Sequence, residues 1–182
     1  MQLQRVPGEP LDPGDEAAAR LLGHGVVLVT GPLDDERVAT TMARVLTLTA
    51  AGDRDTITVH LSNVGGSVSA GLALHDVIAG APATVAVTAA GMLETAGALV
   101  LRAGTAGHRT LLPSARVHLR RPDEPETAGV DLESGAREVA HLREAAVAAL
   151  GTPLHPSRLL TAKEAVEAGL ADQVAAVRSA RT

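Results

Sequence analysis

The sequence predicts an α/β fold built from repeated βαβ units. Short apolar and β-branched runs alternate with longer segments of helical periodicity through residues 26–102. Glycine and proline mark the breaks between these segments, as at Gly31 and Pro32. Strands that alternate with helices in this way pair mostly in parallel through right-handed crossovers.

The expected strands are short. Residues 56–61 show the clearest pattern, because β-branched residues alternate there with polar ones. A tight turn is expected at Gly65-Gly66 and another near Gly91, each leading into a helix. Strands are predicted over residues 26–29, 56–61, 84–88, 108–111 and 116–119, with a last apolar run at 173–177.

Helices are expected between the strands. Asp34 has the residue type and position of a helix N-cap, and Val38, Met42 and Val45 follow it at helical spacing. The longest helical pattern follows the repeated part of the chain and is expected to project from the main body. Helices are predicted over residues 15–22, 35–51, 68–79, 95–102, 131–150 and 161–168.

The composition excludes several kinds of function. Phe, Tyr, Trp and Cys are all absent. Single-stranded nucleic-acid binders stack bases on aromatic rings, and 16 basic against 21 acidic residues leave no basic footprint. Without cysteine there is no disulfide and no thiolate metal site. We therefore expect an aliphatic core, no nucleic-acid partner, no metal and no cofactor.

The chain also lacks the patterns of a membrane or secreted protein. Residues 83–101 form the most apolar stretch, but Glu94 lies within it, so we interpret it as a buried strand and helix. Residues 1–16 contain no apolar core of a secretory signal. We expect a cytoplasmic protein with no membrane partner. Its organisation is predicted as a flexible segment at residues 1–14, one domain at 15–178 and a tail at 179–182.

The segment SNVGGSVSAGLALHD at residues 62–76 resembles the proteolytic subunit of the ATP-dependent Clp protease. In that family a strand ends in Asn-Ser-Pro-Gly-Gly-Ser-Val, and a helix opens with Ala-Gly-Leu-Ala. Further segments match in the family's order and with nearly the same spacing. They lie at residues 21–36, 103–109, 112–117, 136–138, 161–165 and 169–172, so that the resemblance extends over about residues 15–177.

The resemblance implies a crotonase-like head with a protruding helix-strand handle at about residues 120–150. It also implies assembly into stacked seven-membered rings, co-assembly with active subunits of the family, and an AAA+ unfoldase as partner. Unfoldase loops dock in family pockets that typically include aromatic residues. This chain has no aromatic side chain, so we expect weakened unfoldase docking.

The family's activity is that of an ATP-dependent serine endopeptidase, which needs a nucleophile, a base and an orienting carboxylate. The matching stretch at residues 91–98 places Thr95 in the serine position, with Glu94 beside it. Arg120 takes the histidine position, and arginine cannot act as a base near neutral pH. His118 lies two residues upstream, displaced by about 6.6 Å along a strand. The aspartate position is lost with a shortened link at residues 151–160.

The oxyanion-binding scaffold persists. Gly65 and Gly66 match the glycine pair that supplies an oxyanion N–H and lines the substrate strand, and Ala96 follows the nucleophile position. Threonine carries an additional methyl group that restricts χ1, and Glu94 adds negative charge where an oxyanion would form. Because a triad acts as a unit, three changed positions predict a subunit that no longer cleaves peptides and serves as a structural or regulatory ring member.

Two other functions remain open from the sequence. The first is an active peptidase with rearranged groups, such as Thr95 with His118. The second is binding of acyl-CoA or another ligand on the crotonase-like scaffold, with Glu94 as acid or base and Arg120 and Arg121 facing an anionic group. These residues also have structural interpretations. Glu94 and Thr95 can be first-turn helix residues, Gly65 and Gly66 tight-turn glycines, and the two arginines solvated surface residues.

Overall fold

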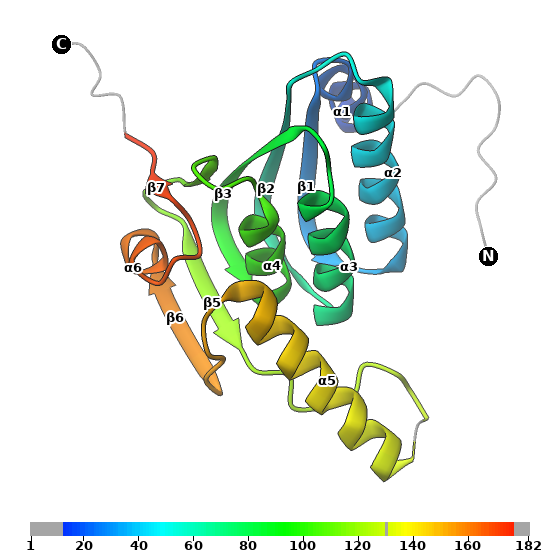
Figure 1. The fold of residues 1–182 in the computed structure, drawn as a ribbon, viewed down its shortest axis with the longest axis vertical. Coiled ribbons are helices and arrows are strands. Elements are labelled where there is room, and N and C mark those ends of the chain that lie inside the picture. Colours follow the sequence, from blue (N-terminus) through cyan, green and yellow to red (C-terminus); the bar gives the residue numbers. More distant parts are fainter. Residues whose placement is uncertain (1–12, 130, 177–182) are drawn as a thin grey trace.

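The fold is built on one β-sheet, against which helices pack (Figure 1). The computed structural model describes residues 13–129 and 131–176. In them the sheet has the order β1-β2-β3-β4-β7, and β5 pairs with β3 and with β6. All pairs are parallel except β5 with β6. The strands are β1 (Val26–Leu33), β2 (Thr56–Gly66), β3 (Thr84–Glu94), β4 (Arg109–Leu111), β5 (Arg116–Arg120), β6 (Ser157–Thr161) and β7 (Gln173–Val174).

The helices alternate with the strands as predicted. Helices α2, α3 and α4 lie side by side over one face of the sheet, and α5 extends away from it (Figure 1). The Asp34 carboxylate caps α2 by accepting a hydrogen bond of 2.8 Å from the backbone N–H of Arg37. No helix in the described part of the chain is both long and apolar enough to cross a bilayer. The helices are α1 (Pro13–Gly23), α2 (Asp35–Ala51), α3 (Val68–Ala79), α4 (Thr95–Ala103), α5 (Leu132–Leu150) and α6 (Ala162–Glu167).

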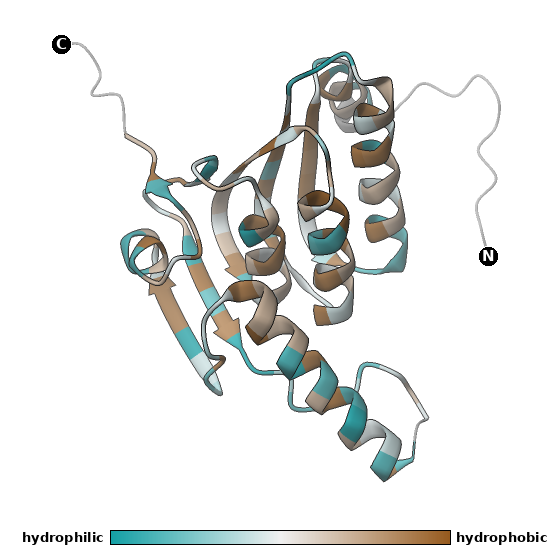
Figure 2. Cartoon of the chain, in the orientation of Figure 1, coloured by the Kyte–Doolittle hydropathy of each residue, from teal (hydrophilic) through white to brown (hydrophobic). Residues whose placement is uncertain are grey.

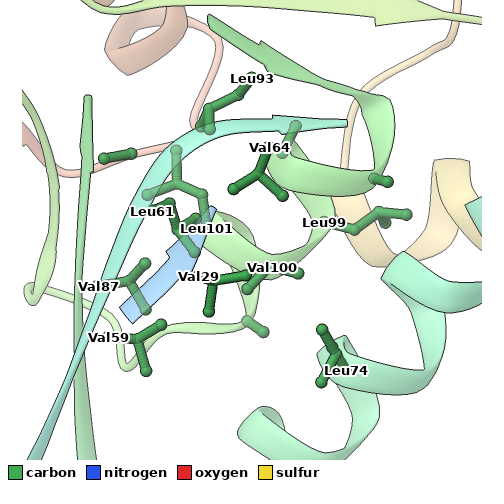
Figure 3. Close-up of a cluster of buried hydrophobic side chains, with 14 of the residues drawn as sticks. Val29, Val59, Leu61, Val64, Leu74, Val87, Leu93, Leu99, Val100 and Leu101 are labelled. Carbon is green, nitrogen blue, oxygen red and sulfur yellow. The ribbon is translucent and has the colours of Figure 1, made fainter. Parts of the chain in front are cut away.

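The core is aliphatic, as the composition requires. Valine and leucine side chains of the parallel strands pack against those of α3 and α4 in one buried cluster (Figure 3). Helix α5 alternates between hydrophilic and hydrophobic residues along its length (Figure 2), and the residues that it buries include Val139, Leu142 and Leu150. The core thus consists of many medium-sized aliphatic side chains. Their burial supplies the main favourable free energy of folding.

Strands β2 and β3 are longer than the sequence predicts, and both turn predictions were wrong. Gly65 and Gly66 continue β2 by pairing with β1, and Gly91 lies inside β3. Positive φ angles at Asn63 (51°) and Gly91 (69°) coincide with a shift of register between β2 and β3. The Asn63 side chain accepts a hydrogen bond of 3.0 Å from the N–H of Met92 there. The glycine signal therefore marks a bulge in a continuing strand.

Strand β3 has two partners along one edge. Its residues 87–89 pair with β4, and its residues 92–94 pair with β5. Strand β6, which completes the β5 edge, was not predicted from the sequence. Its sequence, SRLLT, does not alternate apolar with polar residues, and only Leu160 in it is buried. It therefore lacks the pattern by which a strand is predicted.

The described elements can be compared with the predicted N-terminal segment, tail and handle. Helix α1 begins at Pro13, a residue type favoured in the first turn, so the predicted flexible segment 1–14 overlaps it. The rest of that segment, Val177 and the predicted tail 179–182 lie outside the described residues. The handle consists of α5 and the chain before it, which has no strand between residues 121 and 129.

A part-buried ion pair joins two of the segments that carry the family resemblance. The Asp172 carboxylate accepts hydrogen bonds of 2.9 Å from the backbone N–H and from Nε of Arg109, and a further one from its Nη2. Arg109 is buried. The hydrogen bonds from its guanidinium lower the pKa of Asp172 to about 2, against the opposing effect of burial.

We expect Asp172→Asn to lower the free energy of unfolding at pH 7 by about 1–2 kcal/mol. Because the folded pKa lies below the unfolded value, the stabilisation is complete above about pH 4 and is lost as the pH falls toward 2. Urea unfolding at pH 7 and pH 3 measures both values. A difference between the two proteins that stays constant from pH 7 to pH 3 would contradict the assignment.

Candidate functional site

Thr95 lies at the first position of α4, directly after β3, and its side chain is buried. Its hydroxyl donates a hydrogen bond of 2.8 Å to the carbonyl oxygen of Arg120 and accepts one of 2.8 Å from the N–H of the same residue. The hydroxyl therefore continues the connection between the end of β3 and β5. Its proton points to a carbonyl oxygen, which cannot act as the base that a nucleophile requires.

Glu94 covers the glycine pair. Its carboxylate accepts a long hydrogen bond of 3.4 Å from the N–H of Gly66. A Cβ atom added at Gly65 would lie 2.8 Å from the Glu94 Cδ, so a larger residue at this position would collide with the side chain. The carboxylate thus occupies the space in front of the N–H that the resemblance assigns to an oxyanion, and its negative charge opposes a second anion there.

Gly66 also has a packing requirement of its own. Its φ of 95° lies in a region that residues with a Cβ rarely adopt. A Cβ there would stand 2.5 Å from the backbone nitrogen of Leu33 in β1. The close approach of β1 and β2 is by itself a sufficient structural reason for a glycine at this position.

His118 is directed to a residue that sequence reasoning missed. It lies on β5 in register with Glu94 of β3 and Leu159 of β6. Its Nε2 lies 2.8 Å from the Oγ of Ser157 on β6. Among the hydrogen bonds of the described residues, His118 has neither Thr95 nor a carboxylate as partner. A prediction of β6 would have been needed to find Ser157.

The arginines of the site lie at the end of β5. The Arg120 side chain is exposed, and the backbone of the residue provides the contacts to Thr95. The Arg121 Nε donates a hydrogen bond of 3.0 Å to Asp123. The chain thus has an exposed guanidinium where the resemblance expects an imidazole, and Arg121 is paired with the neighbouring Asp123 carboxylate.

Two cavities meet at Glu94 and Gly66. The larger has a volume of about 520 Å³ and the smaller one of about 290 Å³, and both residues line each of them. Carboxylates outnumber arginines in the lining of the larger cavity, so it does not select for an anion. No group of three or more His, Asp or Glu side chains that could hold a metal occurs within residues 13–129 and 131–176. The larger cavity is lined by Gly66, Val68, Glu94, Thr95, Arg120, Arg121, Pro122, Asp123, Glu124, Glu126 and Pro156.

Glu126 lines this cavity and is, like Ser157, a residue that sequence reasoning missed. Its carboxylate accepts hydrogen bonds from the Ser67 hydroxyl, from the N–H of Val68, and from both the N–H and the hydroxyl of Ser69. Burial alone would raise the pKa of Glu126, but the hydrogen bonds from Ser69, Ser67 and Val68 outweigh it and lower the pKa below its ordinary value. Glu126 is therefore held as a carboxylate at the first turn of α3.

The comparison with known proteins identifies the family. A family model described as Clp protease matches residues 13–178. The chain belongs to the Clp protease family. The ATP-dependent Clp protease proteolytic subunit 2 of Mycolicibacterium paratuberculosis (strain ATCC BAA-968 / K-10) is 33% identical to it over 122 residues. That match covers 67% of this chain and 61% of the relative's length.

The family assignment confirms the predicted family and fold class of this Clp-family protein. The alternation of strands and helices is the one that the resemblance implied. The interpretation of Thr95, Arg120 and the missing aspartate as a lost triad stays a prediction, as does the oxyanion role of Gly65, Gly66 and Ala96. Substitutions that remove the hydrogen bonds of Thr95, Glu94 or His118 can test it.

We expect Thr95→Val to destabilise the protein by about 1–3 kcal/mol, because the backbone N–H and carbonyl of Arg120 both lose a partner. Thr95→Ser keeps the hydroxyl and serves as the matched control, with a much smaller loss. Urea unfolding of the three proteins measures the difference. Equal stability of the Val variant and the parent would show that these two hydrogen bonds do not support the fold.

Proposed function

We propose that this Clp-family protein is a ring subunit with a structural or regulatory role that does not hydrolyse peptides. The observation that carries the proposal is the double hydrogen bond between the Thr95 hydroxyl and the backbone of Arg120. A buried hydroxyl that bonds both a carbonyl oxygen and an N–H is a structural group. A nucleophile would need its proton directed to a base.

The surroundings of Thr95 support the same conclusion. Arginine remains protonated at every physiological pH, so Arg120 supplies no base. The His118 imidazole is hydrogen-bonded to Ser157, and the sequence contains no aspartate between residues 131 and 172. The Glu94 carboxylate adds a negative charge beside Gly66, where hydrolysis would need donors free for an oxyanion. The nucleophile, the base and the oxyanion site are thus each unsuited to hydrolysis.

The partners follow from family membership and are part of the proposal. We propose that the chain associates with itself or with active subunits of the family. By taking a place in the ring, this chain would change which subunits the ring contains and how readily the ring opens. A rearranged peptidase using Thr95 with His118 is less well supported, because each of these side chains has another hydrogen-bond partner.

The proposal is tested by measuring hydrolysis and assembly together. We expect turnover of fluorogenic peptides at the level of buffer between pH 6 and 9, and no labelling by a fluorophosphonate probe. We also expect a tag on this chain to recover a ring, alone or with a co-expressed active subunit, in native mass spectrometry. Turnover that Thr95→Ala abolishes would refute the loss of hydrolysis. A monomer under every co-expression condition would refute the ring role.

Docking of an unfoldase is expected to be weaker than for family members with aromatic docking pockets. Aliphatic side chains offer less contact area than aromatic rings, and Phe, Tyr and Trp are absent from this sequence. Pull-down with a cognate AAA+ unfoldase in the presence of ATP measures the docking, with an active ring as the reference. Recovery equal to that reference would contradict the expectation.

A further inference from the structure

Residues 121–127, called the strap here, connect β5 to the handle and form one wall of the larger cavity. Five of the residues that line this cavity belong to the strap: Arg121, Pro122, Asp123, Glu124 and Glu126. The opposite wall includes Gly66, Val68, Glu94 and Thr95. The position of the strap therefore decides how open the candidate site is.

The strap is attached to the body of the protein through Glu126. The N–H of Val68 donates a hydrogen bond of 2.6 Å to the Glu126 carboxylate, and the Ser69 hydroxyl donates one of 2.6 Å. The Ser67 hydroxyl (2.7 Å) and the N–H of Ser69 (3.2 Å) complete the set. N–H groups in the first turn of a helix have no partner within the helix, and a carboxylate satisfies both their hydrogen bonds and the helix dipole.

The strap is attached to α5 by separate contacts. The Glu138 carboxylate of α5 accepts hydrogen bonds from the backbone N–H groups of Glu126 and Thr127 and from the Thr127 hydroxyl. Arg143 of α5 donates a hydrogen bond of 2.7 Å to the carbonyl oxygen of Pro122 and one of 2.8 Å to Asp123. The Glu126 side chain can therefore leave α3 while the strap keeps its contacts with α5.

We propose that Glu126 is a latch whose carboxylate holds the strap against α3 and closes the larger cavity to an incoming peptide segment. Two of the donors that bind Glu126 are the backbone N–H groups of Val68 and Ser69, and a peptide carbonyl or carboxylate would use these groups at the same place. The contact is thus autoinhibitory, since a peptide must displace Glu126 to reach Val68 and Ser69. A peptide is taken as the occupant because the chain belongs to the Clp protease family, and the latch does not depend on the proposed loss of hydrolysis.

Because the sequence contains no cysteine, the reactivity of a single introduced thiol gives a direct test. Val68→Cys places a single thiol at the cavity wall next to the latch, where the valine side chain is buried. The rate at which this thiol reacts with Ellman's reagent measures how often the strap opens. We expect Glu126→Gln to raise that rate by roughly tenfold or more, because an amide lacks the negative charge and presents N–H donors to the N–H groups of α3.

Glu124→Gln is the matched control. Glu124 lines the same cavity and lies on the same strap, but its carboxylate has no hydrogen-bond partner among the described residues. We expect this variant to react at the rate of the Val68→Cys parent. In the Glu126→Gln protein, hydrogen–deuterium exchange should accelerate in residues 67–71 and 121–127 while α2 is unchanged.

Ser69→Ala provides a second variant that keeps every charge. It removes one donor to Glu126, and we expect a smaller acceleration in the same direction. Thiol reactivity and amide exchange that stay at the parent values in Glu126→Gln overturn the latch, and so does an equal acceleration in Glu124→Gln. If Glu126→Gln does not fold, Ser69→Ala decides by the same two readouts. Neither readout depends on hydrolysis, so the latch and the proposed loss of catalysis can fail separately.

Discussion

The pairing of β3 with successive partners along its length is the constraint on which the candidate site depends. β3 pairs with β4 over residues 87–89 and with β5 over residues 92–94. The second pairing brings the end of β3 beside His118 and places Thr95 next to the backbone of Arg120. The bulge at Asn63 allows β2 to remain paired with β3 and then continue to the glycine pair. Without these pairings, Glu94 and Gly66 would not face each other.

The site is organised by backbone groups that side chains satisfy. The Thr95 hydroxyl bonds the backbone of Arg120, and Glu94 approaches the N–H of Gly66. Glu126 takes the first-turn N–H groups of α3. In a protease, such groups must be available to a substrate or an oxyanion. Here side chains of the chain itself bind the N–H groups of Gly66, Val68, Ser69 and Arg120, and the proposed loss of hydrolysis relies on these contacts.

Much of the fold could be predicted, because its signals are local. Helical periodicity and the cap at Asp34 place α2, and the β-branched run places the start of β2. The errors occur where pairing overrides local preference. Gly65 and Gly66 have the composition of a turn, yet the ladder with β1 holds them in a strand. Strand β6 has no local signal, because it forms by pairing with β5 alone.

The sequence by itself predicted the family, most of the order of the elements, and the residues, Thr95 and Arg120, that stand where the resemblance expects a serine and a histidine. Only the tertiary structure decided what those residues contact. The bonds from Thr95 to Arg120, from Gly66 to Glu94 and from Val68 to Glu126 join residues 25, 28 and 58 positions apart. Their geometry follows from strand register and from where the handle leaves the sheet. A local sequence pattern predicts neither the register nor the position of the handle, because register is set by the packing of the whole sheet.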